Sequence, residues 1–309
     1  MNQTEAVAKY LAELLADGVT VIPNAYPAHF IDSLRADVKE FMQRNATIFD
    51  KHLDADGHYP RIINLHLAFP ELLSVLTDNP VSLGVQDSFF KASSSIYTTL
   101  YYERGSAQPI HRDTPYFCTR PEYRYLGVWV ALEDANEVNG CLEVIRKGHL
   151  QPELDRERLA LEEFASLDLV PSDSQTMWEK YQDRVTRQCM DAGLKVEKVA
   201  VKAGDTVIWH PQLPHGGSAI GDITRTRHSL VMHVAPVGTP VYHQDVFFNP
   251  GKPMPEKSAW KYLDWKDRKY AKHPFVEFGH ADPTPPNAFK RAAHKGTVGK
   301  ALSRLFGGK

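Results

Sequence analysis

The pattern of hydrophobic and polar positions divides the chain into a helical start and a strand-rich middle. Apolar residues recur at helical spacing over residues 3–15 and again over 30–43, where Phe30, Leu34, Val38 and Phe41 form one stripe. Residues 18–23 lie between these helices and predict a short strand that ends at a proline. Runs of β-branched and aromatic residues bounded by turn residues then predict strands over 95–102, 125–132, 141–145, 197–201, 206–209 and 227–234.

A second helical pattern interrupts these strands. Residues 153–164 and 174–192 both show a period of 3.6, which predicts a helical insert over about residues 151–195. Helices followed by strands around a helical insert are typical of an α+β protein with an antiparallel sandwich or barrel at its centre. No shift in composition divides the chain, so we predict one domain over residues 1–286. We further hypothesise that the insert forms a lid or a wall of the substrate site.

Composition and charge narrow the class of protein. The 309 residues carry 36 Lys and Arg against 38 Asp and Glu, a net charge of −2, which gives no electrostatic reason to expect nucleic acid as a partner. No stretch is long and apolar enough for membrane insertion, and the first 17 residues do not resemble a secretory signal, so we expect a cytoplasmic protein. Nothing in the pattern specifies an oligomeric state.

Two smaller features complete this picture. The three cysteines are an odd number without CxxC spacing, which argues against a disulfide framework and against a cysteine-based zinc site. From residue 287 to residue 309 the chain carries six lysines and arginines and no acidic residue. Such a run predicts a basic, solvated and poorly ordered tail.

One short segment carries candidate metal ligands. In an extended chain, residues two apart project from the same face, so His111 and Asp113 can offer an imidazole nitrogen and a carboxylate oxygen to one ion. His215 follows a strand-like run at a proline and glycine turn and is the candidate third ligand. Two histidines and one carboxylate leave positions open for other ligands, an arrangement typical of non-haem Fe(II) oxygenases. Zinc with a catalytic water is the main competing metal.

An arginine farther along the chain distinguishes between these metals. Arg225 and Arg227 stand at the entry to an apolar strand, and Ser229 shares the strand face of Arg227. A guanidinium stays charged when it is buried and pairs with a carboxylate through two hydrogen bonds, and a serine hydroxyl can bind the same carboxylate. This combination suits the distal carboxylate of a keto-diacid and favours iron with 2-oxoglutarate over zinc hydrolysis.

Several blocks of sequence, in their order, resemble the phytanoyl-CoA dioxygenase-like family. They span most of the chain from residue 17 to about residue 234, and their ordered occurrence is more specific than any single motif. The blocks are Asp17-Gly-Val-Thr-Val-Ile-Pro-Asn24, Glu103-Arg-Gly-Ser-Ala-Gln-Pro-Ile-His-Arg-Asp113, Gly127-Val-Trp-Val-Ala-Leu-Glu-Asp134, Asn139-Gly-Cys-Leu-Glu-Val144, Gly204-Asp-Thr-Val-Ile-Trp-His210 and His215-Gly216. One departure is Arg146-Lys-Gly-His149, which stands where the family commonly has Pro-Gly-Ser-His.

The resemblance implies a double-stranded β-helix, the jelly roll of cupin-like proteins, wrapped by helices. It implies that His111, Asp113 and His215 hold Fe(II), that 2-oxoglutarate and O2 are cosubstrates, and that Trp129 lines the 2-oxoglutarate pocket. The family's carboxylate-binding arginine falls between Arg225 and Arg227; we favour Arg227 because it opens the pattern with Ser229. The implied reaction is hydroxylation of an unactivated C–H bond of a small-molecule metabolite, with release of succinate and CO2.

Other residues and other functions stay open at this point. Tyr116 and Phe117 follow Asp113 and are candidates for a substrate wall or for core packing, and His233 shares the face of Arg227 and Ser229 and is a candidate substrate contact. One alternative is a metal-dependent, cupin-type enzyme that does not use 2-oxoglutarate. The other is a non-catalytic jelly-roll binding protein.

Overall fold

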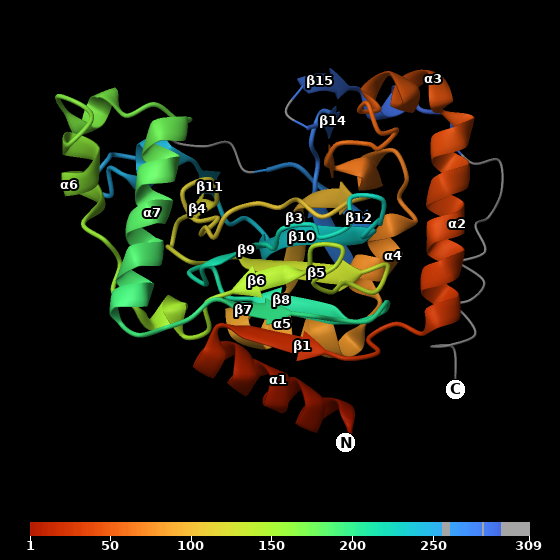
Figure 1. Cartoon of the computed structure of the whole chain (residues 1–309), viewed down its shortest axis with the longest axis horizontal. Helices are drawn as coiled ribbons and strands as arrows, with labels where there is room; N and C mark the ends of the chain where they lie inside the picture. The colour runs from red at the N-terminus through yellow and green to blue at the C-terminus, as the bar shows by residue number, and fades with distance from the viewer. Residues whose placement is uncertain (255–259, 280, 292–309) are drawn as a thin grey trace.

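The centre of the molecule is a ten-stranded sheet. The computed structural model describes residues 1–254, 260–279 and 281–291. Eight strands of this sheet follow one another in the order β1-β8-β5-β10-β3-β2-β14-β15, and β13 joins at β3 and carries β12 beside it (Figure 1). Their bounds are β1 Val19–Ile22, β2 Ile62–Ile63, β3 Ser94–Tyr102, β5 Leu126–Ala131, β8 Thr206–Trp209, β10 Ser229–Pro236, β12 Tyr262–Trp265, β13 Arg268–Ala271, β14 Val276–Phe278 and β15 Ala281–Thr284.

A second, smaller sheet completes the jelly roll. Its three strands lie in the order β7-β6-β9 and span β7 Glu197–Val199, β6 Leu142–Val144 and β9 His215–Gly217. A separate antiparallel pair joins β4 Cys118–Thr119 to β11 Val241–Tyr242. The predicted α+β fold with an antiparallel sandwich at its centre is confirmed.

The helices cover one face and both ends of the strands. In Figure 1, α1 lies beside β1, α2 and α3 lie at one end, and α6 and α7 lie at the other. Their bounds are α1 Gln3–Asp17, α2 Ala28–Arg44, α3 Ala46–Phe49, α4 Leu72–Thr77, α5 Pro80–Phe90, α6 Arg156–Leu161, α7 Gln175–Asp191 and α8 Gln244–Phe247. Five single 3₁₀ turns add Asp50–His52, Leu65–Leu67, Gly148–Leu150, Leu167–Leu169 and Pro286–Ala288.

The central strands β5 and β10 are buried on both faces because another part of the molecule packs on each face. On β5 and β10 the even-numbered residues, such as Val128 and Met232, pack into the large core beneath the helices. The odd-numbered residues Trp129 and Val231 belong to a second core between the two sheets. Since successive side chains of a strand point to opposite faces, one face of these strands supports the fold and the other faces the interior of the jelly roll.

The first residues of the predicted tail contact the helices through one buried side chain. Phe289 is 5% exposed and packs against the rings of Phe41 and Phe49, and the Lys290 amide donates to the Asn45 side chain at 2.7 Å. Phe289 and the Lys290 backbone therefore attach this segment to the helical end of the molecule, while residues 287, 288, 290 and 291 are exposed. The rest of the predicted tail, 292–309, lies outside the described residues. Within the described chain, no helix is both long and apolar enough to span a membrane.

A buried histidine makes the stability of this fold dependent on pH. His66 is completely buried against β3, where its Nδ1 lies 2.8 Å from the Thr99 hydroxyl; burial, with a smaller effect of His273, lowers its pKa from 6.5 to about 3. Below pH 6.5 the unfolded chain therefore takes up a proton that the folded chain does not, and the free energy of unfolding falls. We expect His66 alone to lower it by about 2 kcal/mol between pH 7.5 and pH 5.

Urea unfolding of the wild type and of His66→Phe at both pH values measures this effect. The loss of stability on acidification should be about 2 kcal/mol smaller in the variant, whatever the variant's stability at neutral pH. An equal loss in both proteins would contradict the assignment.

Candidate functional site

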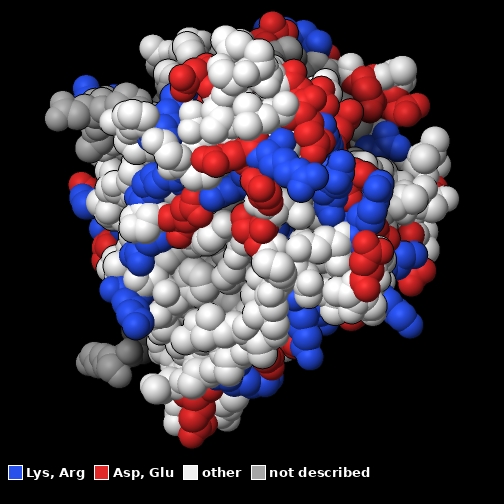
Figure 2. All heavy atoms as spheres, turned by 90° about the vertical axis from the view of Figure 1, so that its left-hand side faces the viewer, with Lys and Arg blue, Asp and Glu red and all other residues white. Residues whose placement is uncertain are grey.

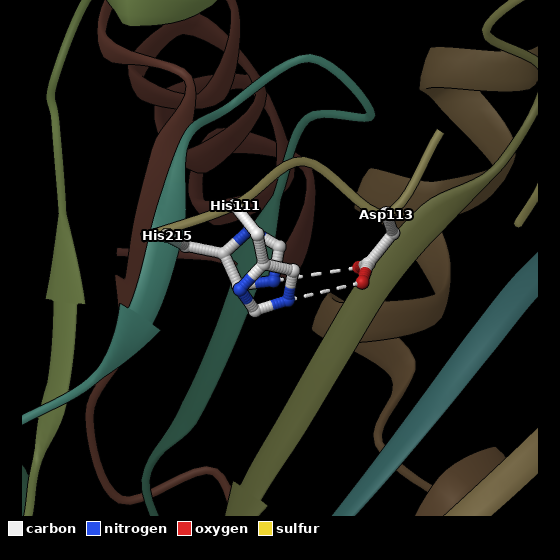
Figure 3. A group of neighbouring side chains, drawn as sticks. All are labelled: His111, Asp113 and His215. Atoms are coloured by element: carbon white, nitrogen blue, oxygen red, sulfur yellow. Dashed lines mark ion pairs between the residues drawn. The ribbon is translucent and has the colours of Figure 1, made fainter. Parts of the chain in front are cut away.

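The structure brings the three predicted ligands together inside the jelly roll. His111 and His215 come from neighbouring extended segments, which exchange two backbone hydrogen bonds of 2.7 and 2.9 Å. This places the two imidazoles side by side, and both face the carboxylate of Asp113 (Figure 3). The Nε2 atoms of His111 and His215 lie 3.3 and 3.4 Å from the Asp113 oxygens, and one ligand atom from each residue lies within 4.8 Å of the others.

Hydrogen bonds to the backbone orient both imidazoles. The Nδ1 of His111 lies 2.8 Å from the Pro109 carbonyl oxygen, and the Nδ1 of His215 lies 3.0 Å from that of Leu213. A carbonyl oxygen can only accept, so each ring carries a proton on Nδ1 and turns its Nε2 toward Asp113. With a metal ion bound, this Nε2 would carry no proton and would act as the ligand atom.

Gly216 makes the close approach of the two segments possible. A Cβ atom at this position would lie 2.6 Å from the Gln108 carbonyl oxygen and 3.1 Å from the Ile110 nitrogen. Any side chain would push apart the two segments that carry His111 and His215. The glycine after the distal histidine is thus required by packing.

Asp113 is held as an anion. Burial alone would raise the pKa of its carboxyl group, but His215 and His233, with hydrogen bonds from His111 and His215, hold that pKa well below its usual value. His233 is 3% exposed, and its Nε2 lies 3.0 Å from Asp113 Oδ2. The residue that we predicted as a substrate contact therefore touches a candidate ligand.

The cluster opens into a cavity of about 1480 Å³, which is larger than most single-ligand pockets. Its lining includes the predicted residues His111, Asp113, His215, Tyr116, Phe117, Trp129, Arg227 and His233. The ring of Phe117 stacks on that of His233 with centroids 3.9 Å apart, and the Tyr116 hydroxyl donates to Asp173 at 2.7 Å. Phe117 and Tyr116 thus both contribute to the wall of the cavity.

Arg227 is a buried cation without a carboxylate partner among the described residues. It is 4% exposed, one terminal nitrogen donates to the Gly140 carbonyl at 2.6 Å, and its Nε has no hydrogen-bond partner. Its guanidinium lies 5.5 Å from the centre of the Trp129 ring, and burial lowers its pKa. Burying an unpaired charge is costly, so this position suits an anionic ligand.

The other two residues of the predicted anion site differ in their placement. Ser229 is fully buried on the same strand face, and its hydroxyl has no partner in the described chain, although it is not among the residues that line the cavity. Arg225 is exposed and is also absent from the lining. Arg227 is therefore buried in the cavity lining, whereas Arg225, the alternative from the sequence, is exposed and outside that lining.

A connection between the insert and the candidate metal ligands was not predicted from the sequence. The side chain of Gln182 on α7 accepts from the Arg112 amide at 2.8 Å and donates to the Arg112 carbonyl at 3.0 Å. Arg112 stands between His111 and Asp113 and is 0% exposed; its guanidinium donates to the Gly148 carbonyl at 2.9 Å. In an extended segment, the residue between His111 and Asp113 points to the opposite face. The position of Arg112 was therefore the one sequence signal that could have predicted a buried partner for this segment.

We expect Gln182→Leu to weaken Fe(II) binding about 10- to 100-fold, the usual effect of removing a group that orients metal ligands. The reason is that the peptide between His111 and Asp113 loses both of its side-chain hydrogen bonds. Anaerobic metal titration measures the change. Gln188→Leu on the same helix is the matched control, since the Gln188 amide donates to Pro152 instead. Equal affinities in the two variants would contradict the role of Gln182.

Known solved structures share this fold. The epimerase SnoN from nogalamycin biosynthesis, in complex with Fe3+, alpha ketoglutarate and nogalamycin RO, is 17% identical with a TM-score of 0.59, and the match covers 86% of this chain and 98% of that one. EctD from S. alaskensis with 2-oxoglutarate and 5-hydroxyectoine is 15% identical with a TM-score of 0.55, covering 74% and 76%. These likenesses confirm the predicted jelly-roll fold.

Curated relatives match over a shorter part of the chain. Peroxisomal phytanoyl-CoA dioxygenase of Bos taurus is 29% identical over 116 residues, which are 37% of this chain and 29% of the bovine protein. Phytanoyl-CoA dioxygenase domain-containing protein 1 of Danio rerio is 51% identical over 39 residues, 13% of each chain. The matched segment thus spans less than a third of either relative.

The sequence profile of the family described as phytanoyl-CoA dioxygenase (PhyH) matches residues 14–229, a span that includes all three candidate ligands and Arg227. This span is well over half of the chain and agrees with the blocks from which we predicted the family. The protein therefore belongs to the phytanoyl-CoA dioxygenase family.

Proposed function

We propose that this protein is an Fe(II)- and 2-oxoglutarate-dependent dioxygenase that hydroxylates an unactivated C–H bond of a small-molecule metabolite. The observation that carries the proposal is that one cavity holds both a His-Asp-His cluster and a buried guanidinium without a carboxylate partner among the described residues. Membership of an oxygenase family and solved structures of the same fold with bound iron and 2-oxoglutarate support it.

The donor set fits the proposed metal. Two neutral imidazoles and one carboxylate occupy one side of an ion and leave the other side open for further ligands. His111, Asp113 and His215 would hold Fe(II) through two Nε2 atoms and a carboxylate oxygen. The adjacent His233 would hold the second Asp113 oxygen by a hydrogen bond, which orients the carboxylate.

The other end of the cavity fits the proposed cosubstrate. Arg227 would pair with the distal carboxylate of 2-oxoglutarate, with Ser229 beside it and the face of Trp129 as a wall. When bound, iron and 2-oxoglutarate together activate O2 for oxidation of a C–H bond, with release of succinate and CO2. The side chains of this chain bind the ligands, orient them and exclude water from the buried end of the cavity.

Anaerobic titration of the purified protein with Fe(II) and 2-oxoglutarate tests this function. We expect a weak visible absorption band that appears only when both are present, and slow formation of succinate once O2 is admitted. Absence of the band at saturating 2-oxoglutarate would overturn the proposal. A zinc or manganese enzyme that does not use 2-oxoglutarate would show no succinate and no dependence on O2.

We place the enzyme in the cytoplasm. Its three cysteines are buried and free, which suits a reducing compartment, although the bovine relative is named as peroxisomal. Fractionation of the source cells, with immunodetection of the protein, tests this location; recovery with an organelle fraction would overturn it.

A further inference from the structure

Helix α7 presents two different stripes of side chains. Its buried stripe consists of Met177, Tyr181, Val185 and Cys189, and the first three of these pack in an apolar core. A second stripe at helical spacing lines the catalytic cavity and consists of Gln175, Trp178, Glu179, Gln182, Asp183 and Thr186. This second stripe contains no aliphatic residue. The wall that α7 forms is therefore polar, acidic and aromatic, whereas the aliphatic part of the lining comes from other elements, namely Ile63, Leu100, Ile110, Leu142 and Val231.

The lining of the cavity contains more acidic side chains than lysines and arginines. Besides Asp113, four acidic residues line it, namely Asp173, Glu179, Asp183 and Glu277. Besides Arg227, the described lining contains one guanidinium, that of Arg61, and no lysine. A coenzyme A thioester needs basic residues around its phosphates, and this lining provides carboxylates instead.

An aromatic pair lies between these carboxylates and the metal ligands. The ring of Trp178 lies 5.6 Å from that of His111 and 4.8 Å from that of Tyr116. The Tyr116 hydroxyl donates to Asp173, and Glu179 is the residue that follows Trp178. Aromatic faces beside carboxylates are the arrangement that holds an organic cation, and this one adjoins the proposed iron site.

The basic residues of α7 make ion pairs of their own. Lys180 pairs with Glu162 and Glu163 at 2.8 and 2.7 Å, and Arg184 pairs with Glu162. Arg187 pairs with Asp183, but both side chains are more than 60% exposed, and such a pair is weak in water. Figure 2 shows acidic and basic side chains interleaved on the outside of this end of the molecule. Asp173, Glu179 and Asp183 line the cavity but are themselves exposed, so they lie at its solvent-facing rim.

We propose that the substrate carries an ammonium or other organic cation, held by Trp178 and Tyr116 and by the carboxylates of Asp173, Glu179 and Asp183, and that it is not an acyl-coenzyme A. This inference rests on the proposed function, because the cation is placed relative to the iron site. The cation binds against α7 and Tyr116, and the carbon to be oxidised lies on the side toward His111.

The first experiment measures succinate release from 2-oxoglutarate with a metabolite library sorted by net charge. We expect the compounds that stimulate succinate release most to be amines, quaternary ammonium compounds or zwitterions. Stimulation mainly by acyl-coenzyme A thioesters or by other anions would overturn the inference.

The second experiment replaces the carboxylates with neutral amides of nearly the same shape. We expect Glu179→Gln with Asp183→Asn to raise the KM of the best cationic compound about tenfold, and Trp178→Leu to have an effect of similar size. Asp191→Asn, at the exposed end of the same helix, is the matched control and should leave KM unchanged. An unchanged KM in both cavity variants would contradict the proposed cation site.

Different results would overturn the proposed oxygenase function and the proposed cation site. The anaerobic absorption band with Fe(II) and 2-oxoglutarate requires no substrate, so its absence would overturn the oxygenase function itself. If the band is present and N-benzyltrimethylammonium, used as a probe in calorimetry, binds the wild type no better than it binds Trp178→Leu, only the cation site is overturned.

Discussion

Replacement of Asp113 by alanine is expected to lower Fe(II) affinity and 2-oxoglutarate turnover by more than about 100-fold, which is above the usual effect of removing a group that only orients a ligand. Asp113 is the only carboxylate in the metal-binding cluster of the described chain, and it lies within 3.4 Å of three imidazole nitrogens. Its removal leaves neutral donors that cannot offset the charge of the ion. Anaerobic Fe(II) titration and succinate release measure the two losses.

The control for Asp113→Ala must separate metal binding from folding. Asp191→Ala removes an exposed carboxylate at the end of α7 and should leave metal content and turnover within about twofold of the wild type. Thermal unfolding of both metal-free proteins shows whether Asp113→Ala folds. A folded Asp113→Ala protein with full Fe(II) affinity would refute the proposed metal site.

Replacement of Arg227 by leucine is expected to raise the Kd for 2-oxoglutarate by at least about 100-fold, since removing one partner of a buried ion pair costs about 3–5 kcal/mol. Fe(II) binding should change little, because Arg227 is not part of the His-Asp-His cluster. The measurement is titration of the Fe(II)-loaded protein with 2-oxoglutarate in the absence of O2. A large loss of affinity for 2-oxoglutarate with an unchanged affinity for Fe(II) distinguishes a residue that binds the cosubstrate from one that only supports the fold.

Arg225 supplies the matched control for this experiment. It lies two residues before Arg227, carries the same charge and is exposed, so Arg225→Leu should change the Kd for 2-oxoglutarate less than about twofold. Equal effects of the two substitutions would show that the general positive charge of this segment matters, and that the buried guanidinium has no special role.

The strands and the ligands could be predicted because short-range patterns specify them. The buried runs that became β5 and β8 are continuous and end at turn residues, and the His111–Asp113 pair needs only an extended chain to share one face. The sequence favoured Arg227 over Arg225 only through its spacing from Ser229, because a short pattern does not show which side chain is buried. In the structure Arg227 is 4% exposed and Arg225 is exposed, and the Kd measurements above test which of them binds 2-oxoglutarate.

Other features could not be predicted because they depend on contacts between residues that are far apart in the sequence. The short helices and strands depend on packing against distant elements. Helix α5 packs on α1 and β3, β13 on β3 and β14 on β2, whereas α4 packs on the 3₁₀ turn Leu65–Leu67, β12 on β13 and β15 on β14. Gln182 and Arg112 are 70 residues apart, and nothing in the local pattern of either residue indicates a hydrogen bond between them. The acidic stripe of α7 has the sequence pattern of an ordinary exposed helix face, and only the structure shows that it lines the cavity.

The insert between β6 and β7 separates the choice of substrate from the oxidation chemistry. The proposed iron and 2-oxoglutarate ligands come from the jelly roll, whereas α7 contributes a continuous row of six side chains to the cavity and two backbone-directed hydrogen bonds to the ligand segment. Exchange of the cavity-facing row alone, with Gln182 kept, could therefore redirect the enzyme to new compounds while the oxidising centre is preserved.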